Sequence, residues 1–389
     1  MKNQFKKKLM KVFLFLLIFS YFCELILFTN SYILKQSEGI DKFAFYKKLR
    51  NDNDDENITV AMDPYHFLKE KNQNIMPLSS FSNKITVHCN ELGYHSIYNS
   101  DRYGFNNPDT EWDKNIIDFF LVGDRFAHGD CVNEKNTIGG NLRRLSKNNS
   151  VINLGQGGNG PMMELASLRE YLPLVKAKNV IWLYCETNDL VGDGRTEGLN
   201  LELKNLILKN YLIDENFSQN LYLKQELIDL KAKKKLQEYE NYISKSKKEN
   251  KFFKFIKLFQ TRYLIKNQII NSFINKEKII EQKISKEFKD IIIKAKKFSH
   301  YNQSKFYFVY LTDINRYRSK NFDIKKNDYQ KVINFLTNSN VNFIDVHKEL
   351  FEKHHNPLSL FSNSKKKGIY HYNENGYKEV ANLIFKMVN

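Results

Sequence analysis

An apolar strand gives way to a polar turn in the stretch FFLVGDRFAHG, residues 119–129. The run from Ile116 to Val122 is apolar apart from one acid, which is typical of a strand covered on both faces in a parallel sheet. Gly123 and Gly129 bracket the turn that follows. Because ligands bind at the carboxyl ends of parallel strands, the sequence predicts a site at this turn.

The pattern around this strand alternates between strands and helices, which predicts an α/β fold with a doubly wound, five-stranded parallel sheet. The expected strands cover residues 116–122, 151–154, 180–185, 306–311 and 343–346. The expected helices cover residues 136–145, 161–172, 326–336 and 374–388. Residues from about 200 to 300 are rich in Lys, Leu and Ile, and they are too many for a simple crossover. We expect a long helical insertion or lid there.

The N-terminus has the pattern of a membrane-targeting segment. Five lysines within the first 11 residues precede a run from Val12 to Phe28 that is apolar apart from two polar residues and one acid, Glu24. No small-x-small cleavage site follows, so we expect an uncleaved signal anchor over residues 1–29. The basic flank would stay in the cytoplasm, which places the rest of the chain in the periplasm or outside the cell.

Two further segments follow the expected anchor. Residues 30–109 have an irregular pattern, and we expect a stalk and a small extension that packs on the main domain. Residues 110–389 carry the alternating pattern of the α/β domain. A chain of 389 residues suits one main domain with such additions.

The chain carries a formal charge of +17, from 61 basic and 44 acidic residues. The excess lies largely in the N-terminus and in Lys-rich helical sequence between about 200 and 300, not in arginines interleaved with exposed aromatic residues. We therefore expect no nucleic-acid partner and interpret the lysines as a solvated face.

The four cysteines are Cys23, Cys89, Cys131 and Cys185. They form no C-x-x-C motif, so we expect neither a zinc site nor a dense disulfide framework. A pairing of Cys89 with another cysteine stays open. Cys131 and Cys185 are expected to be packing residues, because the sequence shows no base beside either one that would activate a thiol.

Three glycines formally match the dinucleotide motif G-x-G-x-x-G, namely Gly155, Gly157 and Gly160. That motif calls for an acid at the end of the next strand, about twenty residues on, whereas Glu186 lies about thirty residues on. The motif also falls outside the first strand-helix unit of the sheet. We therefore expect no nucleotide cofactor.

Four loops at expected strand ends carry a more specific pattern. They are Gly-Asp-Arg-Phe at 123–126, Asn-Leu-Gly-x-x-Gly at 153–158, Glu-x-Asn-Asp at 186–189 and His-Tyr-Asn-x-x-Gly-Tyr at 371–377. In their order and spacing, residues from about 101 to 389 resemble the SGNH (GDSL-like) hydrolases. The membrane-anchored, envelope-facing members that modify polysaccharides look closest. The resemblance implies a flavodoxin-like three-layer sandwich and an acyl-ester site that needs no cofactor or metal.

The resemblance also implies a role for each loop. His371 would be the general base. The side chain of Asn188 and the backbone N–H groups of Gly158 and residue 125 would form the oxyanion hole. Asp124 would organise the first turn by local hydrogen bonds, and Asp189 would support the third loop.

The chain departs from the family pattern at two positions. Arg125 stands where the family has its nucleophilic serine, and a guanidinium has no lone pair with which to form an acyl-enzyme. The family also commonly places an aspartate two or three residues before the histidine, where this chain has Ile369 and Gly368. An acid from elsewhere, such as Asp313 or Asp345, would have to orient His371.

Two classes of function follow from these observations. The protein is either an esterase or O-acyltransferase that acts on an acylated envelope glycan or other ester, or a non-catalytic binding or assembly protein. In the second class Arg125 supplies a fixed positive charge for a carboxylate or phosphate of an anionic glycan. Ser362 and Ser364 precede the histidine loop, and nothing in the sequence recommends either as a replacement nucleophile.

Overall fold

The computed structural model describes residues 2–37, 42–70, 72–145, 149–186, 189, 199–248, 255–274, 284–318, 323–362 and 371–389. The chain divides into two compact units. The smaller unit contains residues 1–41 and 236–282, and the larger contains residues 42–235 and 283–389.

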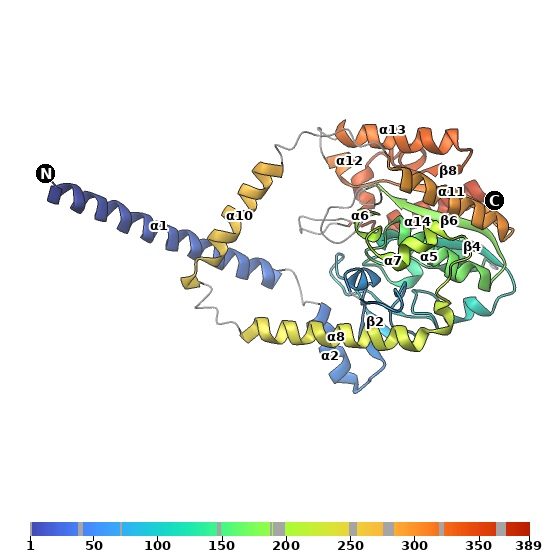
Figure 1. The fold of residues 1–389 in the computed structure, drawn as a ribbon, viewed down its shortest axis with the longest axis horizontal. Coiled ribbons are helices and arrows are strands. Elements are labelled where there is room, and N and C mark those ends of the chain that lie inside the picture. The colour runs from blue at the N-terminus through green and yellow to red at the C-terminus, as the bar shows by residue number, and fades with distance from the viewer. Residues whose placement is uncertain are drawn as a thin grey trace. The chain divides into compact units, whose positions relative to one another are not determined.

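The centre of the larger unit is an all-parallel sheet of five strands in the order β5-β4-β6-β7-β8 (Figure 1). The strands are β4 (Ile117–Gly123), β5 (Val151–Asn153), β6 (Ala177–Cys185), β7 (Lys305–Leu311) and β8 (Asn342–Asp345). The predicted doubly wound sheet is confirmed, and the largest shift of a strand end is at β6, which begins at Ala177 instead of 180. The chain moves from β4 to β5 on one side and then to β6 on the other. The carboxyl end of β4 is therefore the switch point at which such sheets bind ligands.

Alternate residues of β4 belong to two separate cores, one on each face of the sheet. Phe120 and Val122 pack into the core that contains α5 (Pro161–Tyr171) and α11 (Lys286–Tyr301). Phe119 and Leu121 pack into the other core. The second core contains α4 (Ile138–Leu145) and α14 (Glu374–Val388). This two-sided burial explains the unbroken apolar run in the sequence and produces the three-layer sandwich.

The described residues form further helices. They are α2 (Lys42–Asn53), α3 (Arg125–His128), α6 (Leu199–Glu202), α7 (Leu206–Ile213), α8 (Gln225–Lys248), α12 (Asn315–Arg318) and α13 (Asp323–Asn338). Short 3₁₀ segments are η1 (Pro64–Phe67), η2 (Asp109–Asp113), η3 (Glu134–Asn136), η4 (Leu172–Leu174), η5 (Leu221–Leu223) and η7 (Pro357–Leu360), and η6 (His347–Phe351) is a π-helical turn. Within the Lys-rich stretch, α7 and α11 both contact α5 and so help to cover the sheet.

The segment before the sheet has a small sheet of its own, in the order β1-β2-β3. Its strands are β1 (Ile58–Val60), β2 (Ile85–Val87) and β3 (Ile97–Asn99), and β2 pairs parallel with β1 and antiparallel with β3. A disulfide between Cys89 and Cys131 joins the loop after β2 to the turn after β4. The prediction that Cys131 is only a packing residue was therefore wrong, because its partner lies 42 positions away in a segment whose fold the sequence pattern did not reveal.

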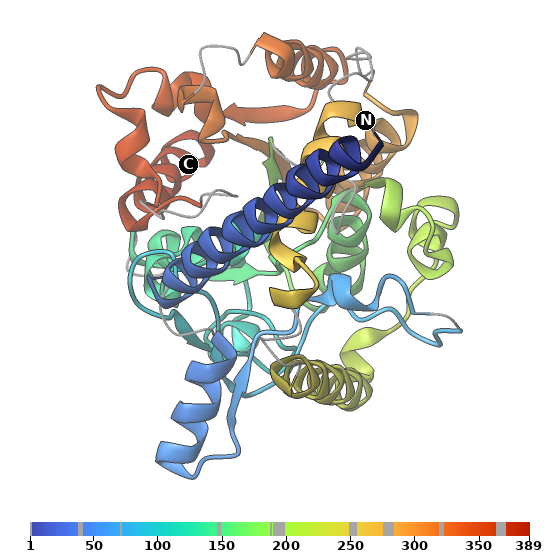
Figure 2. The ribbon, with the colours of Figure 1, turned by 90° about the vertical axis from the view of Figure 1, so that its left-hand side faces the viewer.

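The smaller unit is built on α1 (Lys2–Ser37), whose segment Gln4–Thr29 is 26 residues long and apolar enough to cross a membrane. A membrane anchor and a signal sequence both have this property. The helix extends beyond the expected anchor, and it contacts α10 (Phe259–Ile274) in the same unit (Figure 2).

The single acid of the apolar run caps α10. Glu24 is buried, and its carboxylate accepts hydrogen bonds from Gln260 N (2.9 Å), Thr261 N (2.7 Å) and Thr261 Oγ1 (2.8 Å). The hydroxyl of Tyr21 donates to the carbonyl of Ile256 at 3.0 Å. The first N–H groups of a helix have no partner within the helix, so a carboxylate from α1 satisfies them. This contact gives a physical reason for an acid within the apolar run.

Candidate active site

The turn after β4 is held in shape by its own polar side chain. Asp124 accepts a hydrogen bond from Phe126 N at 2.8 Å and so caps α3, whose first residue is Arg125. Gly129 ends this helix with a φ of 82°, and a Cβ there would lie 2.2 Å from a methyl group of Thr137. Only glycine fits that position without displacing Thr137. The backbone of the turn thus has little freedom.

Arg125 projects from this turn as a half-buried, permanently charged group. Burial opposes its charge, but the carboxylates of Asp124 and Asp130 outweigh burial and raise the pKa of Arg125 above its ordinary value. The guanidinium therefore has no neutral form at any accessible pH. The first residue of α3 thus places a permanent cation at the carboxyl end of β4.

His371 is oriented by Glu91, a residue that the sequence analysis missed. The Nδ1 atom of His371 lies 2.9 Å from Glu91 Oε1. The other oxygen of Glu91 accepts hydrogen bonds from Ser362 Oγ (2.7 Å) and from the backbone N–H of His371 (3.3 Å). A carboxylate that fixes a histidine in this way leaves Nε2 as the atom that can accept a proton.

The two acids suggested for this role have other partners. Asp313 accepts from Asn315 N at 2.5 Å, and Asp345 accepts from Lys348 N at 3.0 Å and from the Tyr329 hydroxyl. Glu91 lies 280 positions before His371, so no local spacing indicates it. The only signal was its place two residues after Cys89, and that signal becomes useful once the disulfide to Cys131 is known.

The charges of Glu91 and His371 stabilise each other. Burial would raise the pKa of Glu91, but the hydrogen bond and charge of His371 outweigh burial, and the pKa falls below 4.5. Burial would lower the pKa of His371, but Glu91 and then Asp130 outweigh burial, and the pKa rises above 6.5 even though Arg125 opposes the change. His371 thus carries more positive charge near neutral pH than an exposed histidine.

The ion pair between Glu91 and His371 should stabilise the folded protein only within a window of pH. The contribution of Glu91 is complete above 4.5 and is lost as the pH falls through its lowered pKa. The contribution of His371 is complete below 6.5 and is lost as the pH rises through its raised pKa. We expect Glu91→Gln to lower the free energy of unfolding by about 3 kcal/mol inside this window, because it breaks a buried pair.

Denaturant unfolding of the detergent-solubilised chain across the pH range measures this effect. The difference between the native chain and the Glu91→Gln variant should shrink on both the acid and the alkaline side. Glu374→Gln, which removes an acid that bonds to the Tyr94 hydroxyl, is a matched control. A difference that stays constant with pH would contradict the proposed pairing.

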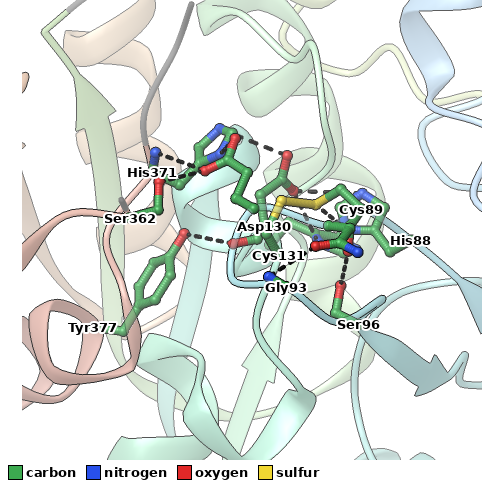
Figure 3. The surroundings of a disulfide bond; sticks show 12 residues. His88, Cys89, Gly93, Ser96, Asp130, Cys131, Ser362, His371 and Tyr377 are labelled. Atoms are coloured by element: carbon green, nitrogen blue, oxygen red, sulfur yellow. Dashed lines mark hydrogen bonds and ion pairs between the residues drawn. A yellow bond between two sulfur atoms is a disulfide. The ribbon is translucent and has the colours of Figure 1, made fainter. Parts of the chain in front are cut away.

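Asp130 lies among three imidazoles close to this pair. Its Oδ1 is 3.3 Å from His128 Nδ1 and 3.6 Å from His88 Nε2, and its Oδ2 is 3.8 Å from His371 Nε2. Figure 3 shows Asp130 between His371 and His88, beside the disulfide. Burial lowers the pKa of His88 to about 3, so this ring is neutral. Burial would raise the pKa of Asp130, but His88 and the other histidines, which are charged at the acid pH where Asp130 titrates, lower it well below its ordinary range.

The glycine-rich loop before α5 is closely packed by other parts of the chain. A Cβ on Gly158, which has a φ of 78°, would lie 2.2 Å from the ring of Tyr65. Glu202 accepts from Gly160 N (2.7 Å) and Met162 N (2.9 Å), so a carboxylate caps the N-terminus of α5. In a dinucleotide site this helix end would receive the pyrophosphate. Here the same N–H groups already have the carboxyl oxygens of Glu202 as their acceptors, and burial raises the pKa of Glu202 to about 7.

The third loop is described only in part, because Asn188 lies outside the described residues. Asp189 is buried, and its Oδ2 accepts from Cys185 N at 2.6 Å. Burial and the nearby charge of Asp124 raise the pKa of Asp189 well above its ordinary value, which favours the neutral acid. Glu186 is a buried structural partner, because it accepts from Asp313 N at 2.9 Å and pairs with Arg316.

Comparisons with known proteins leave the family of this chain unassigned. No family model matches the chain, and no curated protein matches it. Among solved structures, the chain is similar to a member of the lipolytic protein G-D-S-L family from Veillonella parvula. That similarity has 11% sequence identity and a TM-score of 0.36, and it covers 69% of this chain and 97% of the other.

Proposed function

We propose that this protein is a membrane-anchored envelope protein with an SGNH-like site that binds an anionic glycan group without forming an acyl-enzyme. The observation that carries the proposal is the place of Arg125. It is the first residue of α3, directly after the capping residue Asp124, where the SGNH pattern has the nucleophilic serine. A carboxylate or phosphate is the chemistry that an arginine fork recognises best.

The charges around Arg125 support an anion site of modest affinity. His371 supplies a second positive charge, because its pKa is raised and Arg125 is close enough to oppose that change. Asp124 and Asp130 offset part of this charge. Asp124 bonds to Phe126 N, and Asp130 lies among the histidines. The site thus holds two cationic side chains, Arg125 and His371, beside these two carboxylates.

The proposed location is the outer side of the cytoplasmic membrane. Within the segment Gln4–Thr29, Lys6, Lys7, Lys8 and Lys11 precede the apolar run, and by the positive-inside rule this basic end stays in the cytoplasm. The disulfide between Cys89 and Cys131 suits an oxidising compartment. Acylated or acidic polysaccharides of the envelope are ligands available there.

A second candidate function is slow ester hydrolysis without an enzyme nucleophile. His371 Nε2 is buried and has no hydrogen-bond partner among the described residues, while Nδ1 is held by Glu91. Such an imidazole can take a proton from a water molecule whose oxygen attacks the ester carbonyl. Hydrolysis would use the neutral form of His371, which exists above its raised pKa, whereas the anion site uses the charged form.

Loss of the guanidinium should weaken anion binding. We expect Arg125→Ala to reduce the affinity for an oligomeric uronic acid at least about tenfold, because a hydrogen-bonded charge contributes about 1.5–3 kcal/mol. Isothermal titration calorimetry with the detergent-solubilised chain measures the change. Arg102→Ala is the matched control, since Arg102 pairs with Asp109 and Asp113 at the surface. Equal affinities of the native chain and Arg125→Ala would overturn the proposal.

A further inference from the structure

We propose that His88, His128 and Asp130 bind a divalent transition-metal ion of the zinc type. This inference does not depend on the proposed anion site at Arg125. The three side chains come from the loop after β2 and the turn after β4, and each residue is at most 8% exposed. The sequence expectation of no zinc site rested on the lack of a C-x-x-C motif and of a His-rich partner cluster, and the fold brings together histidines that are 40 positions apart.

The distances around Asp130 are too long for good hydrogen bonds but suit a shared metal ion. A charge-assisted N–H···O bond is about 2.7–2.9 Å long. Asp130 Oδ1 instead lies 3.3 Å from His128 Nδ1 and 3.6 Å from His88 Nε2. Ligands about 2.0–2.1 Å from a tetrahedral zinc ion are separated by about 3.3 Å. The separations of Asp130 Oδ1 from the two histidine nitrogens are compatible with ligands that share one metal ion.

Two of these atoms have no other partner. His128 Nδ1 and Asp130 Oδ1 are both buried and have no hydrogen-bond partner among the described residues. A buried polar atom without a partner costs about 1–3 kcal/mol. The two atoms lie 3.3 Å apart, which is the separation of two ligands on one tetrahedral zinc ion. A cation satisfies both at once.

The surroundings of His88 favour metal ligation through Nε2. Its other ring nitrogen, Nδ1, lies 3.3 Å from Cys89 Sγ. A contact of this kind holds the proton on Nδ1 and turns the lone pair of Nε2 toward Asp130, as neighbours of metal-binding histidines commonly do. The rings of His88 and His128 are tilted by 48° with centroids 4.6 Å apart, so they are not stacked face to face.

The donor set selects the class of metal. Cys89 also has a potential ligand atom within 4.8 Å of those of His88 and Asp130, but its sulfur is bonded to Cys131. The available donors are thus two imidazoles and one carboxylate, which suit zinc and its neighbours in the first transition series. Three protein ligands leave at least one coordination position for water.

Cobalt(II) binding tests this site in the oxidised, full-length chain in detergent. We expect one cobalt ion per chain, with the intense visible absorption of four- or five-coordinate cobalt and no sulfur-to-cobalt charge-transfer band. Zinc should displace the cobalt and raise the Tm of the native chain, and a chelator should reverse both effects. A weak octahedral spectrum, a sulfur band or no binding in the native chain would overturn the proposal.

Variants identify the ligands. His128→Gln and Asp130→Asn should each weaken zinc binding at least about 100-fold, because each removes one of three ligands. The control is His354→Gln with His355→Gln, which removes a stacked histidine pair elsewhere that could bind metal adventitiously. Loss of binding in the control, or full binding in Asp130→Asn, would contradict the assignment. Circular dichroism of each variant checks that it still folds. The cobalt spectrum of the native chain tests the site even if a variant does not fold.

Discussion

Replacing Arg125 by serine should give the protein an esterase activity at least about 10²-fold above that of the native chain. A hydroxyl at the first position of α3 would follow the same Asp124 cap that now positions the guanidinium. His371, oriented by Glu91 at 2.9 Å, is the available base for that hydroxyl. Hydrolysis of p-nitrophenyl acetate by the detergent-solubilised chain measures the gain.

Three control measurements test whether the gain in activity comes from a serine nucleophile at position 125. Arg125→Ala should show no gain, because it opens the site without adding a nucleophile. Adding His371→Ala to Arg125→Ser should remove the gain, because the hydroxyl then has no base. A fluorophosphonate probe should label position 125 only in the serine variant. Equal rates for the serine and alanine variants would show that the loops around Arg125 do not form an acyl-transfer site.

Loss of the disulfide between Cys89 and Cys131 should lower the free energy of unfolding by about 4 kcal/mol. The bond closes a loop with a sequence separation of 42, and this estimate follows from the chain entropy that such a loop removes from the unfolded state. The bond also joins the segment of Glu91 to the turn after β4. We therefore expect the orientation of His371 to loosen as well.

Chemical unfolding of the Cys89→Ser, Cys131→Ser double variant measures this loss. Cys23→Ser is the control, because Cys23 is a free cysteine in α1 and belongs to the other unit. Identical midpoints for the double variant and the native chain would mean that the small sheet β1–β3 docks without help from the bond.

The sequence pattern was sufficient for the framework of the larger unit. Alternating burial along β4, the strand-helix alternation and the glycine-bounded turn at Gly123 are local properties that depend on side chains a few positions apart. The same holds for α1, whose apolar segment is a continuous run. Local periodicity carries this information because backbone geometry sets the spacing of residues that share a face.

The chemistry of the site depended on contacts between distant segments. Glu91 contacts His371, which lies 280 positions later in the chain. Asp130 faces His88, and the next residues, Cys131 and Cys89, are joined by the disulfide. No periodicity relates such residues, because loops that meet only after the sheet has formed can place any polar side chain opposite any other. The sequence alone therefore identified the α/β sheet, the apolar segment of α1 and the cation at Arg125, whereas only the tertiary structure revealed the carboxylate behind His371 and the histidines around Asp130.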